Sequence, residues 1–298
     1  MHILISGGSG LLGSALRRHF TGTGHRVSSL VRRAARNSAE IRWEPSSGAL
    51  DPAVLDGVDA VINLCGASLG GRPWSPAYKE VMYSSRLEPV HTLVTALRAS
   101  ATPPAVFLSA SATGYYGQHD ADAASEDAPV GSNSLLADIC RQWEAAAAPA
   151  AEVTRTVMVR TGVVLAPRGG ALSKLLLPLT LGLGGPLGNG RQFWPWITLA
   201  DYVAAIDFLL HSPAAGPVNL CSPEPASVGQ LIQALGRELH RPTRLPVPAF
   251  VLRLGLGEMA EEMLLTSTIA VPSTLLELGF SFGQPDAPSA ARWVAAQR

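Results

Sequence analysis

Residues 2–13 read HILISGGSGLLG, a short apolar run that leads directly into closely spaced glycines. The apolar run predicts a buried strand, and the amphipathic segment 11–20 after it predicts a helix. In such a turn, one glycine permits the tight bend, one lets the backbone approach a phosphate, and one lets the helix pack on the strand. The helix N-terminus would add free N–H groups and the positive end of its dipole. The residues expected to hold a pyrophosphate are Gly7, Gly10, Leu11, Leu12 and Gly13.

Strand-like and helix-like segments alternate through the rest of the first half. Further strands are predicted at 26–31, 41–44, 58–64, 105–109 and 155–165, and helices at 76–99 and 134–148. This alternation predicts right-handed βαβ units and an α/β fold of the Rossmann type, with a doubly wound parallel sheet. The turn at residues 7–13 would then hold a dinucleotide.

Beyond Pro167 the chain becomes rich in glycine, proline and aromatic residues. We expect a dinucleotide-binding domain over 1–240, in which 166–200 contributes to a smaller C-terminal substrate lobe, and a small C-terminal domain over 241–298. Helices are predicted at 200–210, 228–239 and 249–265, and a strand at 218–220. Lys174 and the patch 193–196 are candidates to line a substrate pocket, although most of the patch is expected to be core.

Composition narrows the classes of partner. Lys+Arg and Asp+Glu both number 23, so the balance of charge offers no argument for nucleic acid or an anionic membrane. The three cysteines, Cys65, Cys140 and Cys221, are widely separated and show no metal-ligand spacing. Signal-peptide and membrane-span patterns are absent from the sequence. We therefore expect a cytoplasmic protein without a metal, a monomer or homodimer, whose partner is a small-molecule substrate.

The end of the second predicted strand indicates which dinucleotide is bound. NAD sites usually place an acidic residue there, to bind the ribose 2′-hydroxyl. This chain instead has Arg32 and Arg33. Guanidinium groups can bind a 2′-phosphate through paired hydrogen bonds, so the sequence favours NADP, as NADPH, over NAD. The alternative is a solvated basic loop.

Several motifs along the chain together resemble one protein family. They are Val61-Ile62-Asn63-Leu64-Cys65-Gly66-Ala67, Ser85-Arg86-Leu87-Glu88, Ser111-Ala112-Thr113-Gly114-Tyr115-Tyr116-Gly117, Trp143-Glu144-Ala145-Ala146, Arg160-Thr161-Gly162-Val163-Val164-Leu165, Gly182-Leu183-Gly184-Gly185-Pro186-Leu187-Gly188, Leu245-Pro246-Val247-Pro248-Ala249-Phe250 and Gly257-Glu258-Met259-Ala260. With the glycine turn, they resemble the epimerase-family branch of the atypical short-chain dehydrogenases/reductases. That branch includes nucleoside-diphosphate-sugar epimerases and SulA-like homologues with a small C-terminal domain.

The resemblance implies further contacts with the cofactor. Asn63, Leu64 and Gly66 would lie beneath it at the end of the fourth predicted strand. Arg86 would face its phosphates or ribose, unless it is a surface arginine paired with Glu88 or with a helix neighbour. Arg160 would be a further ligand, with a structural ion pair as the alternative.

The proton donor is the difficulty in this resemblance. Short-chain dehydrogenases generally use a Tyr-x-x-x-Lys pair, in which the lysine favours the phenolate. Here Leu136 and Cys140 occupy the expected positions, and neither can do this work.

Other residues are therefore candidates for catalysis. Ser111 follows the fifth predicted strand, with Thr113 as a competing choice and backbone capping as the structural alternative. Tyr115 and Tyr116 are the phenols of the same loop, or else ordinary packing residues. Glu126 is expected to be structural.

Two functions remain open on the sequence. The first is an NADP-dependent oxidoreductase or epimerase, acting on a small carbonyl or nucleotide-sugar-like substrate through an altered proton donor. The second is a non-catalytic NADP(H)-binding sensor or scaffold, which the replacement of Tyr-x-x-x-Lys by Leu136 and Cys140 favours.

Overall fold

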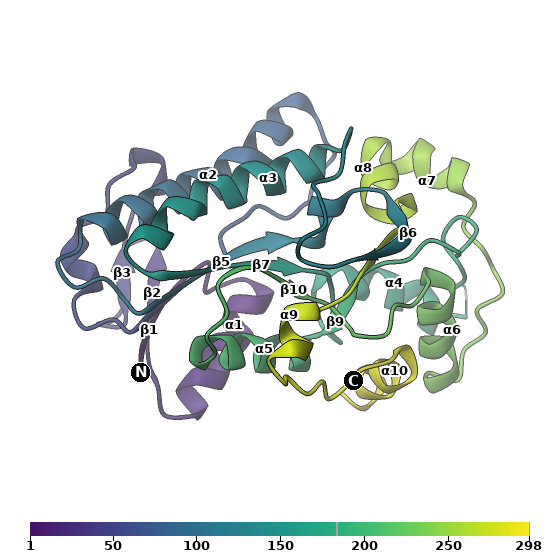
Figure 1. Ribbon diagram of the computed structural model, residues 1–298. Coiled ribbons are helices and arrows are strands. Elements are labelled where there is room, and N and C mark those ends of the chain that lie inside the picture. Colours follow the sequence, from purple (N-terminus) through teal and green to yellow (C-terminus); the bar gives the residue numbers. More distant parts are fainter. Residues whose placement is uncertain (183, 298) are drawn as a thin grey trace. The chain divides into compact units, whose positions relative to one another are not determined.

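The computed structural model describes residues 1–182 and 184–297, apart from the side chains of Ala171 and Lys174 (Figure 1). Leu183 of the glycine-rich motif and the predicted pocket side chain of Lys174 therefore lie outside the described part. The chain divides into two compact units. Unit 1 comprises 1–111, 139–159 and 206–218, and unit 2 comprises 112–138, 160–205 and 219–298.

A seven-stranded sheet is the centre of the dinucleotide-binding fold, in the order β10-β7-β5-β4-β1-β2-β3. Its strands are β1 (His2–Ser6), β2 (Arg26–Val31), β3 (Glu40–Arg42), β4 (Ala60–Asn63), β5 (Val106–Ala112), β7 (Arg155–Thr161) and β10 (Gly216–Leu220). The pairs β1–β2, β1–β4, β2–β3 and β4–β5 are parallel. The predicted Rossmann-type sheet is confirmed. Its strand order reverses between β1 and β4, where such sheets bind ligands beyond the carboxyl ends of the strands.

Helices cover both faces of this sheet (Figure 1). They include α1 (Leu11–Gly22), α2 (Pro76–Ala99), α3 (Leu135–Ala147) and α5 (Leu199–His211). On one face, Leu93 of α2 and Trp143 of α3 share a buried cluster with Leu4 and Phe107 of the sheet. Removing such side chains from water contributes about 1.5–3 kcal/mol each. This packing holds α2 and α3 against the strands whose ends form the candidate site.

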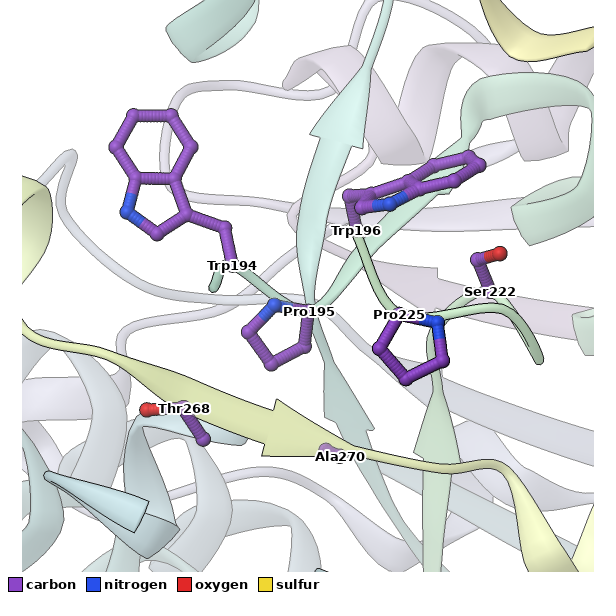
Figure 2. Close-up of a pocket in the computed structure, with 7 residues that line it drawn as sticks. All are labelled: Trp194, Pro195, Trp196, Ser222, Pro225, Thr268 and Ala270. Atoms are coloured by element: carbon purple, nitrogen blue, oxygen red, sulfur yellow. The ribbon is translucent and has the colours of Figure 1, made fainter. Parts of the chain in front are cut away.

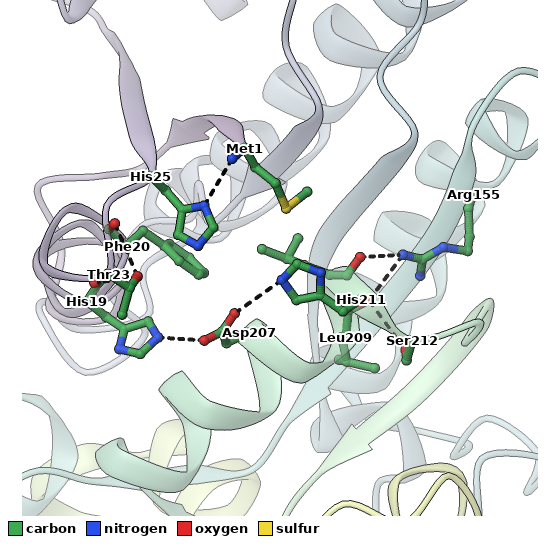
Figure 3. Close-up of polar contacts among 11 residues, drawn as sticks. Met1, His19, Phe20, Thr23, His25, Arg155, Asp207, Leu209, His211 and Ser212 are labelled. Carbon is green, nitrogen blue, oxygen red and sulfur yellow. Dashed lines mark hydrogen bonds and ion pairs between the residues drawn. The ribbon is translucent and has the colours of Figure 1, made fainter.

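Polar contacts tie α1 to the segment of α5 that belongs to unit 1. His19 Nε2 lies 2.7 Å from Asp207 Oδ2, and His211 Nε2 lies 3.7 Å from the other oxygen of that carboxylate. Figure 3 shows both histidines directed toward Asp207 from opposite sides. The same view shows Arg155 bonded to backbone carbonyls, which include Leu209 O at 3.1 Å. The His19–Asp207 contact joins α1, which begins at the glycine turn, to α5.

Unit 2 has its own core and two small sheets. Its elements are β6 (His119–Ala124), β8 (Val163–Leu165), β9 (Trp196–Thr198), β11 (Thr268–Ala270), α4 (Gly170–Thr180), α6 (Val228–Glu238), α7 (Ala249–Leu256), α8 (Glu258–Ala260), α9 (Ser273–Glu277) and α10 (Ala287–Ala296). β8 pairs in parallel with β9, and β11 with β6. Apolar side chains of α4, α6 and α10 form the core. No helix among the described residues is long and apolar enough to cross a membrane.

Two long elements expected from the sequence are interrupted at glycines. The strand predicted at 155–165 divides into β7 and β8 at Gly162, where a Cβ atom would lie 2.5 Å from Pro195 O. The helix predicted at 249–265 ends first at Gly257, whose φ of 57° is left-handed, and then continues as α8 and a π-helical turn. In both places the apolar pattern runs through a backbone break that only glycine tolerates.

Candidate functional site

In the glycine turn of unit 1, backbone atoms lie so close to Gly7 and Gly13 that neither position has room for a side chain. Gly7 has a φ of 73°, and a Cβ atom there would lie 2.7 Å from Leu64 O. A Cβ atom on Gly13 would lie 2.5 Å from Gly7 O. At Gly10 the nearest atom to an added Cβ is Gly7 O at 3.5 Å, so this residue faces open space. Two glycines thus close the turn, and the third leaves its outer side accessible.

The N-terminus of α1 is free to bind an anion. Its N-cap is Gly10, and no side chain caps the helix. The first intrahelical bond runs from Ser14 N to Gly10 O. The N–H groups of residues 11–13 precede this bond and therefore have no acceptor within the helix. Leu11 and Leu12, predicted to contribute these groups, are half-buried. The turn and the uncapped helix together form the cradle that a pyrophosphate requires.

The two arginines after β2 differ in their surroundings. Arg33 makes a bidentate interaction with Glu40 at the start of β3, and both Nη–Oε distances are 2.6 Å. This arrangement lowers the pKa of Glu40 to about 2, chiefly through hydrogen bonds from Arg33. Arg32 is exposed. The sequence predicted that both guanidiniums hold a 2′-phosphate. In the structure the guanidinium of Arg33 already binds a carboxylate, so Arg32 is the principal candidate.

Asn63 ends β4 next to the turn and is fully buried. Its Oδ1 accepts hydrogen bonds from Ser6 Oγ at 2.6 Å and from Cys65 N at 3.3 Å. Its Nδ2 has no hydrogen-bond partner among the described residues. A buried donor without an acceptor is costly, so this amide fits a site that a polar ligand completes.

Arg86 of α2 lies beneath Gly66, just beyond Asn63. A Cβ atom on Gly66 would lie 3.3 Å from Arg86 Cζ. The guanidinium donates to Met82 O at 2.8 Å and Ala67 O at 3.1 Å, and is only 7% exposed. Burial lowers its pKa. The alternative of a surface arginine paired with Glu88 is therefore wrong, although Arg86 does contact a neighbour on its own helix, Met82.

Ser111, near the end of β5, has an acidic partner that sequence reasoning missed. Its Oγ donates to Glu144 Oε1 of α3 at 2.6 Å, and the serine is buried. Glu144 stands one helical turn after Cys140, which is buried, and two turns after Leu136, which is half-buried. The signal was its spacing on the same helical face as the expected tyrosine and lysine positions. A hydroxyl bonded to a carboxylate can pass a proton.

Tyr116 and Arg160 belong to a different cluster, inside unit 2. Arg160 Nη1 donates to Tyr116 Oη at 3.0 Å and to Glu126 O at 2.9 Å. Tyr116 Oη donates to Asn219 Oδ1 at 2.7 Å. The ring of Tyr116 is 1% exposed, and burial raises its pKa to about 12. A phenol enclosed in this way is poorly placed to exchange a proton with a substrate, and Arg160 has the contacts of a structural residue.

The remaining candidates also have structural surroundings. Tyr115 is half-buried, and Arg160 Cζ lies 3.6 Å from the centre of its ring. Thr113 is buried. Glu126 Oε1 accepts from Asn219 N at 3.0 Å, in keeping with the structural role expected for it. Across the described residues, no group of His, Cys, Asp or Glu side chains is arranged to hold a metal ion.

Replacement of Arg160 by methionine is expected to destabilise unit 2. Methionine keeps the approximate length but removes the hydrogen bonds of a buried cation, which include those to Tyr116 and Glu126; a hydrogen bond to a charged group contributes about 1.5–3 kcal/mol. We expect the thermal midpoint to fall by about 5–10 °C. The matched control is Arg168→Met, which changes an exposed arginine of the same unit and should leave the midpoint unchanged. Weaker NADPH binding with an unchanged midpoint would instead identify Arg160 as a cofactor ligand.

The aromatic patch at 193–196 is largely buried. Trp194 is 8% and Trp196 1% exposed, so both belong mainly to the core, as expected. Together with Pro195 they also line a narrow pocket, which the remaining lining residues complete: Ser222, Pro225, Thr268 and Ala270. Figure 2 shows the two indoles on either side of Pro195.

Comparison with known proteins gives two family matches. Residues 3–221 match the NAD dependent epimerase/dehydratase family. Residues 247–294 match a domain of unknown function, DUF1731. The first match contains every residue assigned above to the cofactor site and the Ser111–Glu144 pair.

Relatives and solved structures resemble the chain over nearly its whole length. An epimerase family protein of Mycobacterium bovis is 42% identical over 282 residues, which are 94% of this chain and 93% of the relative. The crystal structure of human epimerase family protein SDR39U1 with NADPH is 31% identical, with a TM-score of 0.93 and coverage of 100% of both chains. A nucleoside-diphosphate sugar epimerase from Corynebacterium glutamicum is 28% identical, with a TM-score of 0.80, over 99% of this chain and 58% of that one.

Proposed function

Because the chain belongs to the NAD dependent epimerase/dehydratase family, we propose that it is an NADPH-dependent oxidoreductase or epimerase. Its substrate would be a small carbonyl or carbinol compound or a nucleotide-sugar-like compound. The observation that carries this proposal is that unit 1 contains two features together: a glycine turn followed by a helix without a side-chain cap, and the Ser111–Glu144 hydrogen bond. The first supports cofactor binding and the second supports proton transfer.

The residues present fit the cofactor. The turn at residues 7–13 and the start of α1 would hold the pyrophosphate, and exposed Arg32 the 2′-phosphate. The donor Asn63 Nδ2 lacks a partner among the described residues and would gain one from a bound ligand. The binding of NADPH by the human relative supports the same assignment. Bound NADPH would supply the hydride that a carbonyl carbon accepts.

The Ser111–Glu144 pair would supply the proton. In reduction, Ser111 Oγ donates its proton to the carbonyl oxygen and regains one from a protonated Glu144. In oxidation, Ser111 Oγ takes the carbinol proton while its own proton passes to Glu144. The 2.6 Å hydrogen bond from Ser111 to Glu144 is already oriented for this second direction. The pair thus offers a route for the proton without the tyrosine and lysine that this chain lacks.

The direct test measures binding and turnover on the same purified protein. NADPH affinity is measured by titration calorimetry, and NADPH oxidation is followed with a panel of aldehydes, quinones and nucleotide sugars. We expect binding of NADPH and turnover with at least one class. Binding without turnover on the whole panel would favour the non-catalytic sensor or scaffold. Absence of NADPH binding would overturn the proposal.

The preference for NADPH over NADH is expected to depend on Arg32. One charge-assisted phosphate contact contributes about 1.5–3 kcal/mol, so Arg32→Ala should weaken NADPH binding at least about tenfold. NADH lacks the 2′-phosphate, and its affinity should not change. The matched variant is Arg33→Ala. It should weaken NADPH binding less, because the guanidinium of Arg33 is already bonded to Glu40. Equal affinities of the unmodified protein for NADPH and NADH would contradict this assignment.

A further inference from the structure

Arg86 is a buried cation without a carboxylate partner among the described residues. A guanidinium carries five N–H donors. Arg86 uses one on Met82 O and one on Ala67 O, which leaves three without an acceptor in the described part of the chain. A buried charge that is incompletely hydrogen-bonded destabilises the fold. The side chain is therefore better explained by a ligand than by stability.

The surroundings of Arg86 hold the guanidinium in one place. Its Cζ lies 5.2 Å from the ring centre of Trp143 on α3, an arrangement that favours a cation over the aromatic face. Gly66 leaves room for it from above, since an added Cβ would approach Cζ to 3.3 Å. A fixed cation next to the end of β4 lies on the ligand-binding side of the sheet.

Cys140 lies on α3 about one helical turn before Trp143, the residue whose ring faces Arg86. Cys140 occupies the position on α3 where the related dehydrogenases have the lysine of Tyr-x-x-x-Lys. Position 140 of α3 therefore carries no cation, and Arg141 next to it is exposed, whereas α2 supplies a buried cation, Arg86, beside the ring of Trp143.

We propose that Arg86 replaces the missing lysine, and that its unused N–H groups bind the ribose hydroxyls of the nicotinamide half of the cofactor. This inference rests on the proposed function and refines it, because it assigns Arg86 to one half of the dinucleotide. The glycine turn would bind the pyrophosphate, and Arg32 would bind the 2′-phosphate of the adenine half. Arg86 is then a cofactor-binding residue at the reactive end of the site.

The test uses two ligands, because the proposal separates the halves of the cofactor. Titration calorimetry of the full-length protein measures NADPH and adenosine 2′,5′-bisphosphate, which lacks the nicotinamide half. We expect Arg86→Gln to weaken NADPH binding about tenfold, as expected for a lost charge-assisted contact, with unchanged affinity for the bisphosphate. Arg86→Lys keeps the charge and should remain within about threefold of the unmodified protein.

Two further variants complete the design. Arg98→Met changes an exposed arginine of the same helix, paired with Glu152, and should affect neither ligand. Adding Cys140→Lys to Arg86→Gln places a cation at position 140 of α3 and should restore part of the NADPH affinity. Thermal unfolding confirms that each variant is folded.

The outcomes separate this inference from the proposed function. Unchanged NADPH affinity in Arg86→Gln would overturn the inference, as would equal losses in the glutamine and lysine variants. Equal weakening of NADPH and the bisphosphate would also overturn it, because Arg86 would then serve the adenine half. Failure of the unmodified protein to bind NADPH would instead overturn the proposed function itself.

Discussion

Ser111→Ala is expected to lower turnover of the active substrate by about a hundredfold or more, while NADPH affinity stays unchanged. A positioned acid or base contributes about 10²–10⁴-fold to such reactions. Alanine removes the hydroxyl that contacts Glu144 at 2.6 Å but leaves β5 and the glycine turn intact. The measurement is steady-state oxidation of NADPH with a substrate from the panel, together with calorimetric binding of NADPH.

A second serine of β5 provides the control for this variant. Ser109 Oγ is buried and has no hydrogen-bond partner among the described residues, so Ser109→Ala should leave turnover unchanged. Glu144→Gln keeps a hydrogen-bond acceptor but cannot carry the proton, and should reproduce most of the loss. If Glu144→Gln retains full activity while Ser111→Ala loses it, the serine acts without the carboxylate. Full activity in both variants would contradict the pair as the proton route.

The part of the fold that is local in sequence could be predicted well. The bounds of β1, β2 and α2 agree with the predicted segments, because each element is one uninterrupted stretch of the sequence. The glycine turn was recognisable for the same reason: its strand, turn and helix are contiguous. The α-helices and strands that the sequence left unassigned lie in unit 2: β6, β9, β11, α4, α9 and α10. Three of them, β9, β11 and α9, are five residues long or shorter, and half of the six residues of β6 are polar. Such segments give no clear periodicity.

The candidate site was predictable in its residues but less so in their pairings. Asn63 and Arg86 were found from motifs, yet the burial of Arg86 could not be read from helical spacing, because α2 is only weakly amphipathic along its length. Ser111 was found, and its partner Glu144, 33 residues away, was not. The bond from Tyr116 to Asn219 spans 103 residues. Contacts of this kind depend on how distant segments pack, which a single sequence does not display.

Gly13→Ala is expected to abolish measurable NADPH binding, with a loss of at least about a hundredfold. An alanine Cβ would lie 2.5 Å from Gly7 O and 2.7 Å from Gly8 Cα, and both are backbone atoms. Neither can rotate away, so the turn must move relative to the start of α1. Two lost charge-assisted bonds to the pyrophosphate, at about 1.5–3 kcal/mol each, correspond to a hundredfold or more.

Gly22→Ala is the matched control, because it makes the same substitution in the same helix. No atom lies within 4 Å of a Cβ added at Gly22, which ends α1 at the far side from the turn. This variant should bind NADPH like the unmodified protein, since alanine also favours the helix. Both proteins are measured by calorimetry, with thermal unfolding as the check on folding. Normal NADPH affinity in folded Gly13→Ala would show that the cofactor is held elsewhere, because no phosphate could occupy a turn displaced by this clash.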